Sequence, residues 1–204
     1  IEAPTLKMQD FDYSGVDVVL LESPSNPGLD LCDIAAISAK VHAAGGIVMV
    51  DNTTMTPLLQ RPLDLGADVV LASDTKAPAG HSDVLFGHVA SRNAAFMARV
   101  LDWRRLSGAV PGAFEAWLLH RGLETLELRL ARMCASAEVI ATRLLDSGLV
   151  QNLRYPGLKS DASYPLACKQ MQGFGFIMGF DLPSADVAEA FLTNCPFIAQ
   201  ATSF

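Results

Sequence analysis

The fold is decided by residues 48–80, which read VMVDNTTMTPLLQRPLDLGADVVLASDTKAPAG. Two Val-rich apolar runs, Gly46–Val50 and Asp68–Ala72, have the length and composition of buried parallel strands. Asp51 follows the first run directly, and the second run leads to Lys76. Because open α/β sheets bind ligands beyond the carboxyl ends of their strands, we expect Asp51 and Lys76 to project into one crevice.

A carboxylate and a lysine amine in one crevice predict a site for pyridoxal phosphate (PLP). This cofactor forms a Schiff base with a lysine and needs an acid partner for its pyridine nitrogen. Ser73 and Thr75, beside Lys76, supply hydroxyls that could hold its phosphate. Taken alone, an Asp at a strand end is typically a turn former or helix cap, and a loop Lys is typically solvated. The interpretation therefore depends on other stretches of the chain.

The first of these stretches is Leu20–Pro27, which reads LLESPSNP and predicts a strand followed by a turn that carries Asn26. Asn26, Asp51 and Lys76 fall at equal sequence intervals, as successive strand–helix units would place them. This β-α-β-α-β order predicts right-handed crossovers and a parallel sheet, hence an α/β fold.

The remaining elements follow from hydrophobic periodicity and from Gly and Pro punctuation. We expect an irregular segment over the sheet edge at Ile1–Gly15. In the helical stretch at residues 114–145, we expect three arginines on the outer side near Glu124 and Glu127, and these are Arg121, Arg129 and Arg132. Helices are predicted at Asp33–Ala44, Pro57–Leu65, Asn93–Leu106, Pro165–Met171 and Ala185–Leu192, and one long or bent helical stretch at Phe114–Leu145. Further strands are predicted at Val16–Leu21, Val84–Ala90, Val150–Tyr155, Phe176–Leu182 and Phe197–Ala201.

Several of these pieces, taken together, resemble the PLP-dependent Cys/Met metabolism (transsulfuration) enzymes. The pieces run in family order and are ESPSNP, VDNTTMTPLLQRPLDLGADVVLASDTK, GHSDV, SGAVPGAFEAWLLHRGLETLELRLARM, YPGL and QMQGFGFIMGFDL. The resemblance implies a fold-type-I PLP-dependent transferase-like fold, with a mainly parallel sheet flanked by helices. It implies that residues 1–147 are part of the large PLP-binding domain with its long connecting helix. Residues 148–204 would then begin a smaller α+β C-terminal domain.

The resemblance also implies roles for individual residues. Lys76 matches the lysine that carries PLP covalently, and Asp51 matches the aspartate paired with the pyridine nitrogen. Asn26 matches an asparagine near the phenolic oxygen of the cofactor. The remaining matches are Ser73 and Thr75 at the phosphate and Ser203 near the substrate carboxylate.

Within this family the chain is most similar to cystathionine γ-lyase, which converts L-cystathionine to cysteine, 2-oxobutanoate and ammonia. A cystathionine γ-synthase or O-acylhomoserine sulfhydrylase of the same family, or a non-catalytic paralogue, is the alternative. Departures from the family pattern at Thr54, Ala77 and Ala79 bear on substrate preference. His81, in the GHSD stretch, is interpreted as a loop-orienting residue in preference to a catalytic one. A nicotinamide-binding Rossmann protein is disfavoured because no G-x-G-x-x-G follows a strand.

The amino-acid composition limits the classes of molecule that the protein is expected to bind. The 204 residues are half apolar and carry a net charge of −7, which argues against nucleic acid. The four cysteines are widely spaced, so we expect reduced thiols in a cytoplasmic protein and no metal site. No apolar run is long enough to cross a membrane. The resemblance further implies a small amino-acid substrate, a homodimer or homotetramer with shared active sites, and a chain that is a fragment of a longer protein.

Overall fold

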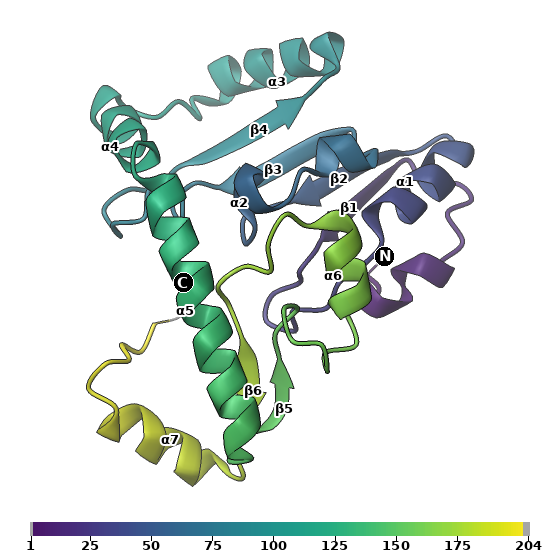
Figure 1. Ribbon diagram of the computed structural model, residues 1–204. Helices are drawn as coiled ribbons and strands as arrows, with labels where there is room; N and C mark the ends of the chain where they lie inside the picture. The colour runs from purple at the N-terminus through teal and green to yellow at the C-terminus, as the bar shows by residue number, and fades with distance from the viewer. Residues whose placement is uncertain (1, 202–204) are drawn as a thin grey trace.

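The main sheet of the protein has four strands, and its computed structural model describes residues 2–201 (Figure 1). Strands β1, β2 and β3 are parallel, as predicted, whereas β4 runs antiparallel to β3. The order in the sheet follows the order in the chain: β1 (Val18–Glu22), β2 (Ile47–Asp51), β3 (Val69–Ser73) and β4 (Gly87–Ser91).

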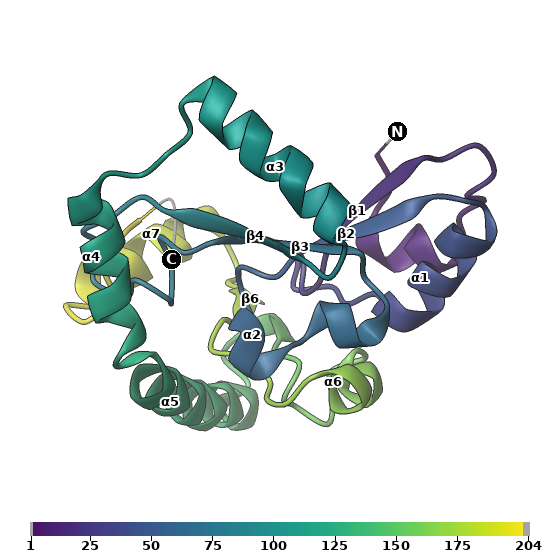
Figure 2. The same cartoon turned by 90° about the horizontal axis from the view of Figure 1, so that it is seen from above.

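The first crossover helix, α1 (Ile34–Ala43), begins at Asp33, whose carboxylate accepts a hydrogen bond from the Ala36 backbone N–H at 3.0 Å. The apolar face of α1 packs on the central strand, where Val48 and Val50 are completely buried. Viewed from above, α1, α2 (Thr56–Leu59) and α6 (Tyr164–Gln170) lie on one face of the sheet and α3 (Ala94–Ser107) lies on the other (Figure 2). The sheet is therefore flanked by helices, as expected for an α/β fold.

The predicted helix at residues 57–65 is wrong, because two shorter elements replace it. α2 ends at Leu59, and a 3₁₀ helix, η2, spans Pro62–Leu65. Gln60 between them is extended, with φ −148° and ψ 138°. Arg61 is also non-helical, with φ −122° and ψ 80°, because the ring of a following proline disfavours the α conformation.

The predicted helix at residues 114–145 divides into α4 (Ala113–Leu123) and α5 (Leu126–Ser147). The break lies at Thr125, which is non-helical with φ −113° and ψ 3°. Gly122, just before the break, packs against the backbone of another segment. A Cβ atom there would lie 2.5 Å from the carbonyl oxygen of Ala79. The chain bends where this close approach requires glycine.

Three further segments differ from the predictions. The N-terminal segment contains a 3₁₀ helix, η1 (Thr5–Asp10), and Tyr13 after it belongs to the core around β1 and β2. The final strand predicted at residues 197–201 is absent from the part of the chain that the structure describes. Residues 84–86 precede β4 and are not part of it, and the Phe86 N–H bonds the Thr75 side-chain hydroxyl in place of a backbone carbonyl.

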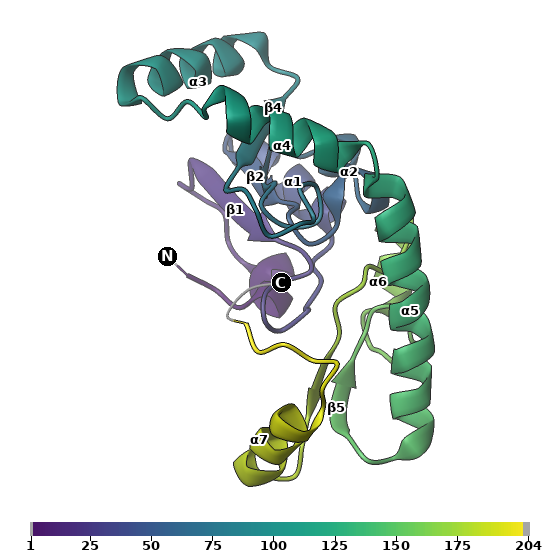
Figure 3. The ribbon, with the colours of Figure 1, turned by 90° about the vertical axis from the view of Figure 1, so that its left-hand side faces the viewer.

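The long helix α5 extends from α4 toward a second, two-stranded sheet (Figures 1 and 3). That sheet pairs β5 (Gln151–Arg154) with β6 (Gly179–Asp181), and α7 (Ala185–Asn194) follows it. α5 ends at Gly148, which caps it in the left-handed conformation. The predicted domain boundary falls at this residue and stays a prediction.

A buried amide network joins α6 to the main sheet. Gln60, with 0% of its surface exposed, donates through Nε2 to the Ser23 carbonyl at 2.7 Å and to Asn52 Oδ1 at 3.1 Å. Asn52 Nδ2 returns a bond to the Gln60 carbonyl at 2.9 Å. From α6, Gln170 donates to Gln60 Oε1 at 3.3 Å and accepts from the Ile34 N–H at 3.4 Å. The network ties α6 to the ends of β1 and β2.

Between residues 2 and 201, no helix combines the length and the hydrophobicity that a bilayer-spanning segment needs. Cys32 and the other three cysteines are free thiols.

Candidate active site

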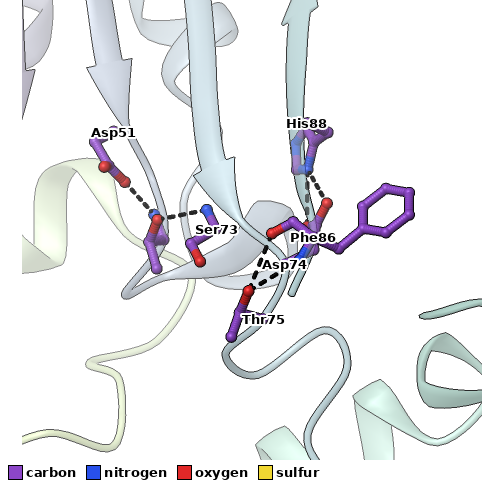
Figure 4. Close-up of polar contacts among 7 residues, drawn as sticks. Asp51, Ser73, Asp74, Thr75, Phe86 and His88 are labelled. Atoms are coloured by element: carbon purple, nitrogen blue, oxygen red, sulfur yellow. Dashed lines mark hydrogen bonds and ion pairs between the residues drawn. The ribbon is translucent and has the colours of Figure 1, made fainter. Parts of the chain in front are cut away.

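The carboxyl ends of β2 and β3 are joined through Thr53 (Figure 4). Asp51 Oδ1 accepts a hydrogen bond from the Thr53 N–H at 2.9 Å, and Thr53 Oγ1 accepts one from the Ser73 N–H at 2.8 Å. Asp51 and Ser73, two of the predicted site residues, are therefore held next to each other by one intervening threonine.

A second carboxylate lies beside Asp51. Glu22 ends β1 and is the register partner of Asp51, so the two side chains leave adjacent strands on the same face of the sheet. Burial raises the pKa of Glu22, and the negative charge of Asp51 raises it further, against a lowering by the Asn26 N–H, which donates to Glu22 Oε2 at 3.2 Å. Two half-buried carboxylates in this arrangement favour a cation between or beside them.

Asn26 belongs to the turn after β1, and its backbone bond to Glu22 holds that turn at the carboxyl end of the strand. Three predicted residues thus follow three neighbouring parallel strands: Asn26 follows β1, Asp51 ends β2 and Ser73 ends β3.

Lys76 sits in a tight turn immediately after β3. Its N–H donates to the Ser73 carbonyl at 3.3 Å, and its carbonyl accepts from the Gly80 N–H at 2.8 Å. The Ala79 N–H also bonds the Asp74 carbonyl at 2.9 Å. The backbone position of Lys76 is therefore defined by hydrogen bonds on both of its sides.

Thr75 fastens this turn to the start of the return strand, a feature we name the Thr75–Phe86 clasp. The Thr75 N–H and Oγ1 both donate to the Phe86 carbonyl at 3.2 Å, and Oγ1 accepts from the Phe86 N–H at 3.0 Å (Figure 4). The hydroxyl proton of Thr75 is used within the protein here, so the predicted phosphate contact requires the hydroxyl to rotate. That contact stays a prediction.

Arg129 is a site residue that the sequence prediction missed. The prediction placed it on the outer side of the long helix near Glu124 and Glu127, and this is wrong. Its guanidinium reaches the turn after Lys76, donating to the Ala77 carbonyl at 2.7 Å and the Pro78 carbonyl at 3.1 Å. It also donates to the Gly122 carbonyl at 2.8 Å and to Thr125 Oγ1 at 3.0 Å. Burial lowers the pKa of Arg129, but a guanidinium remains charged.

His81 contributes to the same turn through its ring Nδ1, which is 2.7 Å from the Ala79 carbonyl. This contact supports the loop-orienting interpretation of His81. Ser203, predicted near the substrate carboxylate, lies outside the described residues.

The chemistry of this set fits PLP. A carboxylate pair that favours a cation matches the protonated ring nitrogen, and a lysine on the turn after the neighbouring strand offers the amine for covalent attachment. A further hydroxyl, that of Ser73, lies between them in the chain.

Comparison with known proteins agrees with this interpretation. A provisionally named cystathionine gamma-lyase of Streptomyces coelicolor is 46% identical over 203 residues, which are 99% of this chain and 52% of that protein. An L-methionine gamma-lyase of Treponema denticola is 44% identical over 91% of this chain and 47% of its own length. The chain thus spans about half the length of these curated relatives.

Solved structures extend the likeness to the fold. A cystathionine gamma synthase from Xanthomonas oryzae pv. oryzae, in complex with aminoacrylate and cysteine, has a TM-score of 0.89 and 37% identity, covering 92% of this chain and 49% of that one. The methionine gamma lyase CalE6 from Micromonospora echinospora has a TM-score of 0.88 and 41% identity, covering 92% of this chain and 51% of that one. Residues 8–204 match the model of one family, and the chain belongs to it: the Cys/Met metabolism PLP-dependent enzymes.

Proposed function

We propose that the protein containing this chain is a PLP-dependent carbon–sulfur lyase that acts on L-cystathionine and yields cysteine, 2-oxobutanoate and ammonia. The observation that carries the proposal is the position of the Lys76 turn, which follows β3 next to β2, whose last residue Asp51 is the register partner of Glu22 on β1. A named γ-lyase among the relatives, from Dictyostelium discoideum with 38% identity, supports this reaction class.

The proposed roles follow from the chemistry of each side chain. When bound, PLP supplies an electron sink for the bonds at the substrate α-carbon. Asp51 would hold the ring nitrogen in its protonated form, and the charge of Glu22 beside it would add to that preference. Lys76 Nζ would carry the cofactor covalently and then move a proton at the substrate α-carbon. The contacts proposed for Asn26, Ser73, Thr75 and Ser203 are those to the phenolic oxygen, the phosphate and the substrate carboxylate.

A synthase of the same family is the second candidate. It is supported by the likeness to the Xanthomonas oryzae cystathionine gamma synthase, at a TM-score of 0.89 and 37% identity. A non-catalytic paralogue is disfavoured by the presence of both Asp51 and Lys76. Incubation of the full-length protein with cystathionine alone, and with an activated homoserine ester plus cysteine, separates the lyase from the synthase by the product formed.

The experiment that tests the proposal is chemical mapping of the cofactor lysine. Borohydride reduction of the PLP-loaded full-length protein, followed by peptide mass spectrometry, is expected to label Lys76. The Lys76→Ala variant should lose both the label and the turnover of cystathionine. Lys40, an exposed lysine on α1, serves as the control position. Labelling of Lys40 or any other lysine in place of Lys76 would overturn the assignment.

We also propose that the protein works in the cytoplasm as a homodimer or homotetramer. Free cysteines suit a reducing compartment. The α3–α4 region exposes large apolar side chains, which mark interaction surfaces, and these are Trp103, Leu106, Val110, Phe114 and Trp117. Light scattering of the full-length protein, compared with a Phe114→Ser/Trp117→Ser variant, tests the assembly; an unchanged mass would count against this surface.

A further inference from the structure

A histidine–aspartate pair lies next to the Lys76 turn and has no part in the roles proposed above. Asp74 is only 4% exposed, and both of its carboxylate oxygens lie within hydrogen-bonding distance of His88 Nδ1, at 2.8 and 2.9 Å (Figure 4). His88 comes from β4, where it is the register partner of Ala72. A buried carboxylate requires such a partner, because its charge is otherwise strongly disfavoured.

The pair holds the Lys76 turn from the face opposite Ser73. Successive residues of a strand point to opposite faces, so Ala72 and Ser73 do so at the end of β3. His88 and Ala72 line the same cavity of about 230 Å³, on the face away from Ser73. Asp74, in the middle of Ser73–Lys76, is anchored to His88 by its side chain while its carbonyl accepts from Ala79 within the turn.

We infer that His88 is a positioning residue that holds the Lys76 turn in place through Asp74. The inference rests on the proposed function of Lys76 for its catalytic meaning, but the contact itself is independent of the cofactor. The contact that links His88 to the turn is its hydrogen bond with Asp74, and we expect His88 to act through that carboxylate.

Several charged groups lie around His88. Asp74 contacts it directly, and the charged residues that line the cavity beside it are Arg61, Asp64 and Arg92. Arg92 pairs with Asp64 at 2.5 Å, and Arg61 Nε donates to the Pro57 carbonyl at 3.4 Å. The hydrogen bond to Asp74 raises the pKa of His88, and the charge of Asp74 adds to this, while burial opposes both.

The direction of that shift gives the pH dependence. A histidine whose folded pKa is raised above its unfolded value of about 6.5 contributes its full stabilisation below that value. The contribution is lost as pH rises through the folded pKa. We therefore expect the Lys76 turn to be held more firmly at pH 6 than above the folded pKa of His88.

Two substitutions separate the hydrogen bond from the charge. His88→Asn offers an amide N–H close to the position of Nδ1 but does not titrate, whereas His88→Ala removes the donor. The matched control is a second pair of the same kind, in which His42 Nε2 lies 2.8 Å from Asp68 Oδ2. Asp68 precedes β3, so this pair lies at the other end of the strand from Lys76. His42→Ala therefore removes a histidine–aspartate contact of the same length far from the turn.

The measurement is amide hydrogen exchange of the peptide covering residues 74–86 in the full-length protein, with and without added PLP, corrected for intrinsic rates. The wild-type peptide is expected to exchange faster as pH rises through the His88 pKa. His88→Asn should remove this pH dependence, and His88→Ala should exchange about tenfold faster at pH 6. His42→Ala should match the wild type in this peptide.

A second readout is the visible absorbance of protein-bound PLP against pH, whose midpoint should move in His88→Ala and stay in His42→Ala. The inference would be overturned if residues 74–86 exchanged at the wild-type rate in His88→Ala, or if His42→Ala accelerated their exchange as much as His88→Ala does. Should His88→Ala fail to fold, a pH dependence retained in His88→Asn would overturn it equally. Borohydride mapping of Lys76 is a separate measurement, so failure of the proposed function would be recognised independently.

Discussion

Replacement of Gln60 by methionine tests whether the buried amide network stabilises the fold. Methionine keeps approximately the length of the glutamine side chain and removes its amide. Gln60 Nε2 donates to the Ser23 carbonyl and to Asn52 Oδ1, and its Oε1 accepts from Gln170. The substitution therefore leaves three polar groups without that partner in a part of the protein where Gln60 itself has 0% exposure.

The expected loss follows from the burial of those groups. An unsatisfied buried polar group costs about 1–3 kcal/mol. Ser23 and Asn52 are almost fully buried and carry the full cost, whereas Gln170 is 6% exposed and keeps its bond from the Ile34 N–H. Two full penalties, reduced by relaxation and by the favourable burial of the methionine, amount to about 3 kcal/mol. This is a large part of a typical stability of about 5–15 kcal/mol.

Equilibrium urea unfolding of the cofactor-free full-length protein measures the effect. With a slope of about 2–3 kcal/mol per molar urea, the unfolding midpoint should fall by about 1–1.5 M. Gln151→Met is the matched control, since Gln151 is exposed on β5, and its free energy of unfolding should stay within about 0.5 kcal/mol of the wild type. Equal midpoints for Gln60→Met and Gln151→Met would refute the reasoning.

Three further predictions concern the site and its surroundings. Asp51→Asn should retain PLP but lower kcat/KM by about 10- to 150-fold, since a charge-assisted hydrogen bond is worth about 1.5–3 kcal/mol. Steady-state kinetics on cystathionine measure kcat/KM, and an unchanged kcat/KM would contradict the role proposed for Asp51 at the ring nitrogen. Arg129→Lys should lower the free energy of unfolding by about 2 kcal/mol and Tm by about 4–8 °C, because a single ammonium cannot donate to all the carbonyls that the guanidinium reaches. Calorimetry compares this variant with Arg132→Lys, in which the replaced arginine is exposed, and equal Tm values for the two variants would count against the prediction. Burial raises the pKa of Cys32 to about 11, so about one Cys32 thiol in a thousand is ionised at pH 8. Alkylation followed by mass spectrometry should therefore label the exposed Cys168 well before Cys32, and the reverse order would show that Cys32 is accessible.

The parallel part of the fold was predictable from local patterns. Val-rich runs place β2 and β3 within about a residue of their observed bounds, and Asp33 caps α1 as its position before an apolar helix indicates. These features depend on residues close together in the chain. The same holds for Asp51 and Lys76, since the end of a strand can be recognised in its own sequence.

The parts that could not be predicted depend on partners distant in sequence. The antiparallel course of β4 follows from its pairing with β3 and from the contacts of Phe86 with Thr75. The hydrophobic pattern of residues 84–90 carries no information about these partners. Arg129 lies outside the apolar stripe of α5, so its sequence context predicts a side chain exposed to solvent. Its carbonyl partner Ala77 lies 52 residues away, and only the folded chain brings the two together.

The Thr75–Phe86 clasp has a consequence for how this enzyme family can diverge. The clasp ties the two ends of the segment between residues 75 and 86, so the segment is a loop whose base is closed by one backbone hydrogen bond and two bonds of the Thr75 hydroxyl. Substitutions or added residues near its tip, around Ser82 and Asp83, leave Lys76 at the base where it is. A loop of this kind can vary in sequence and length at its tip between homologues while Lys76 keeps its place at the base.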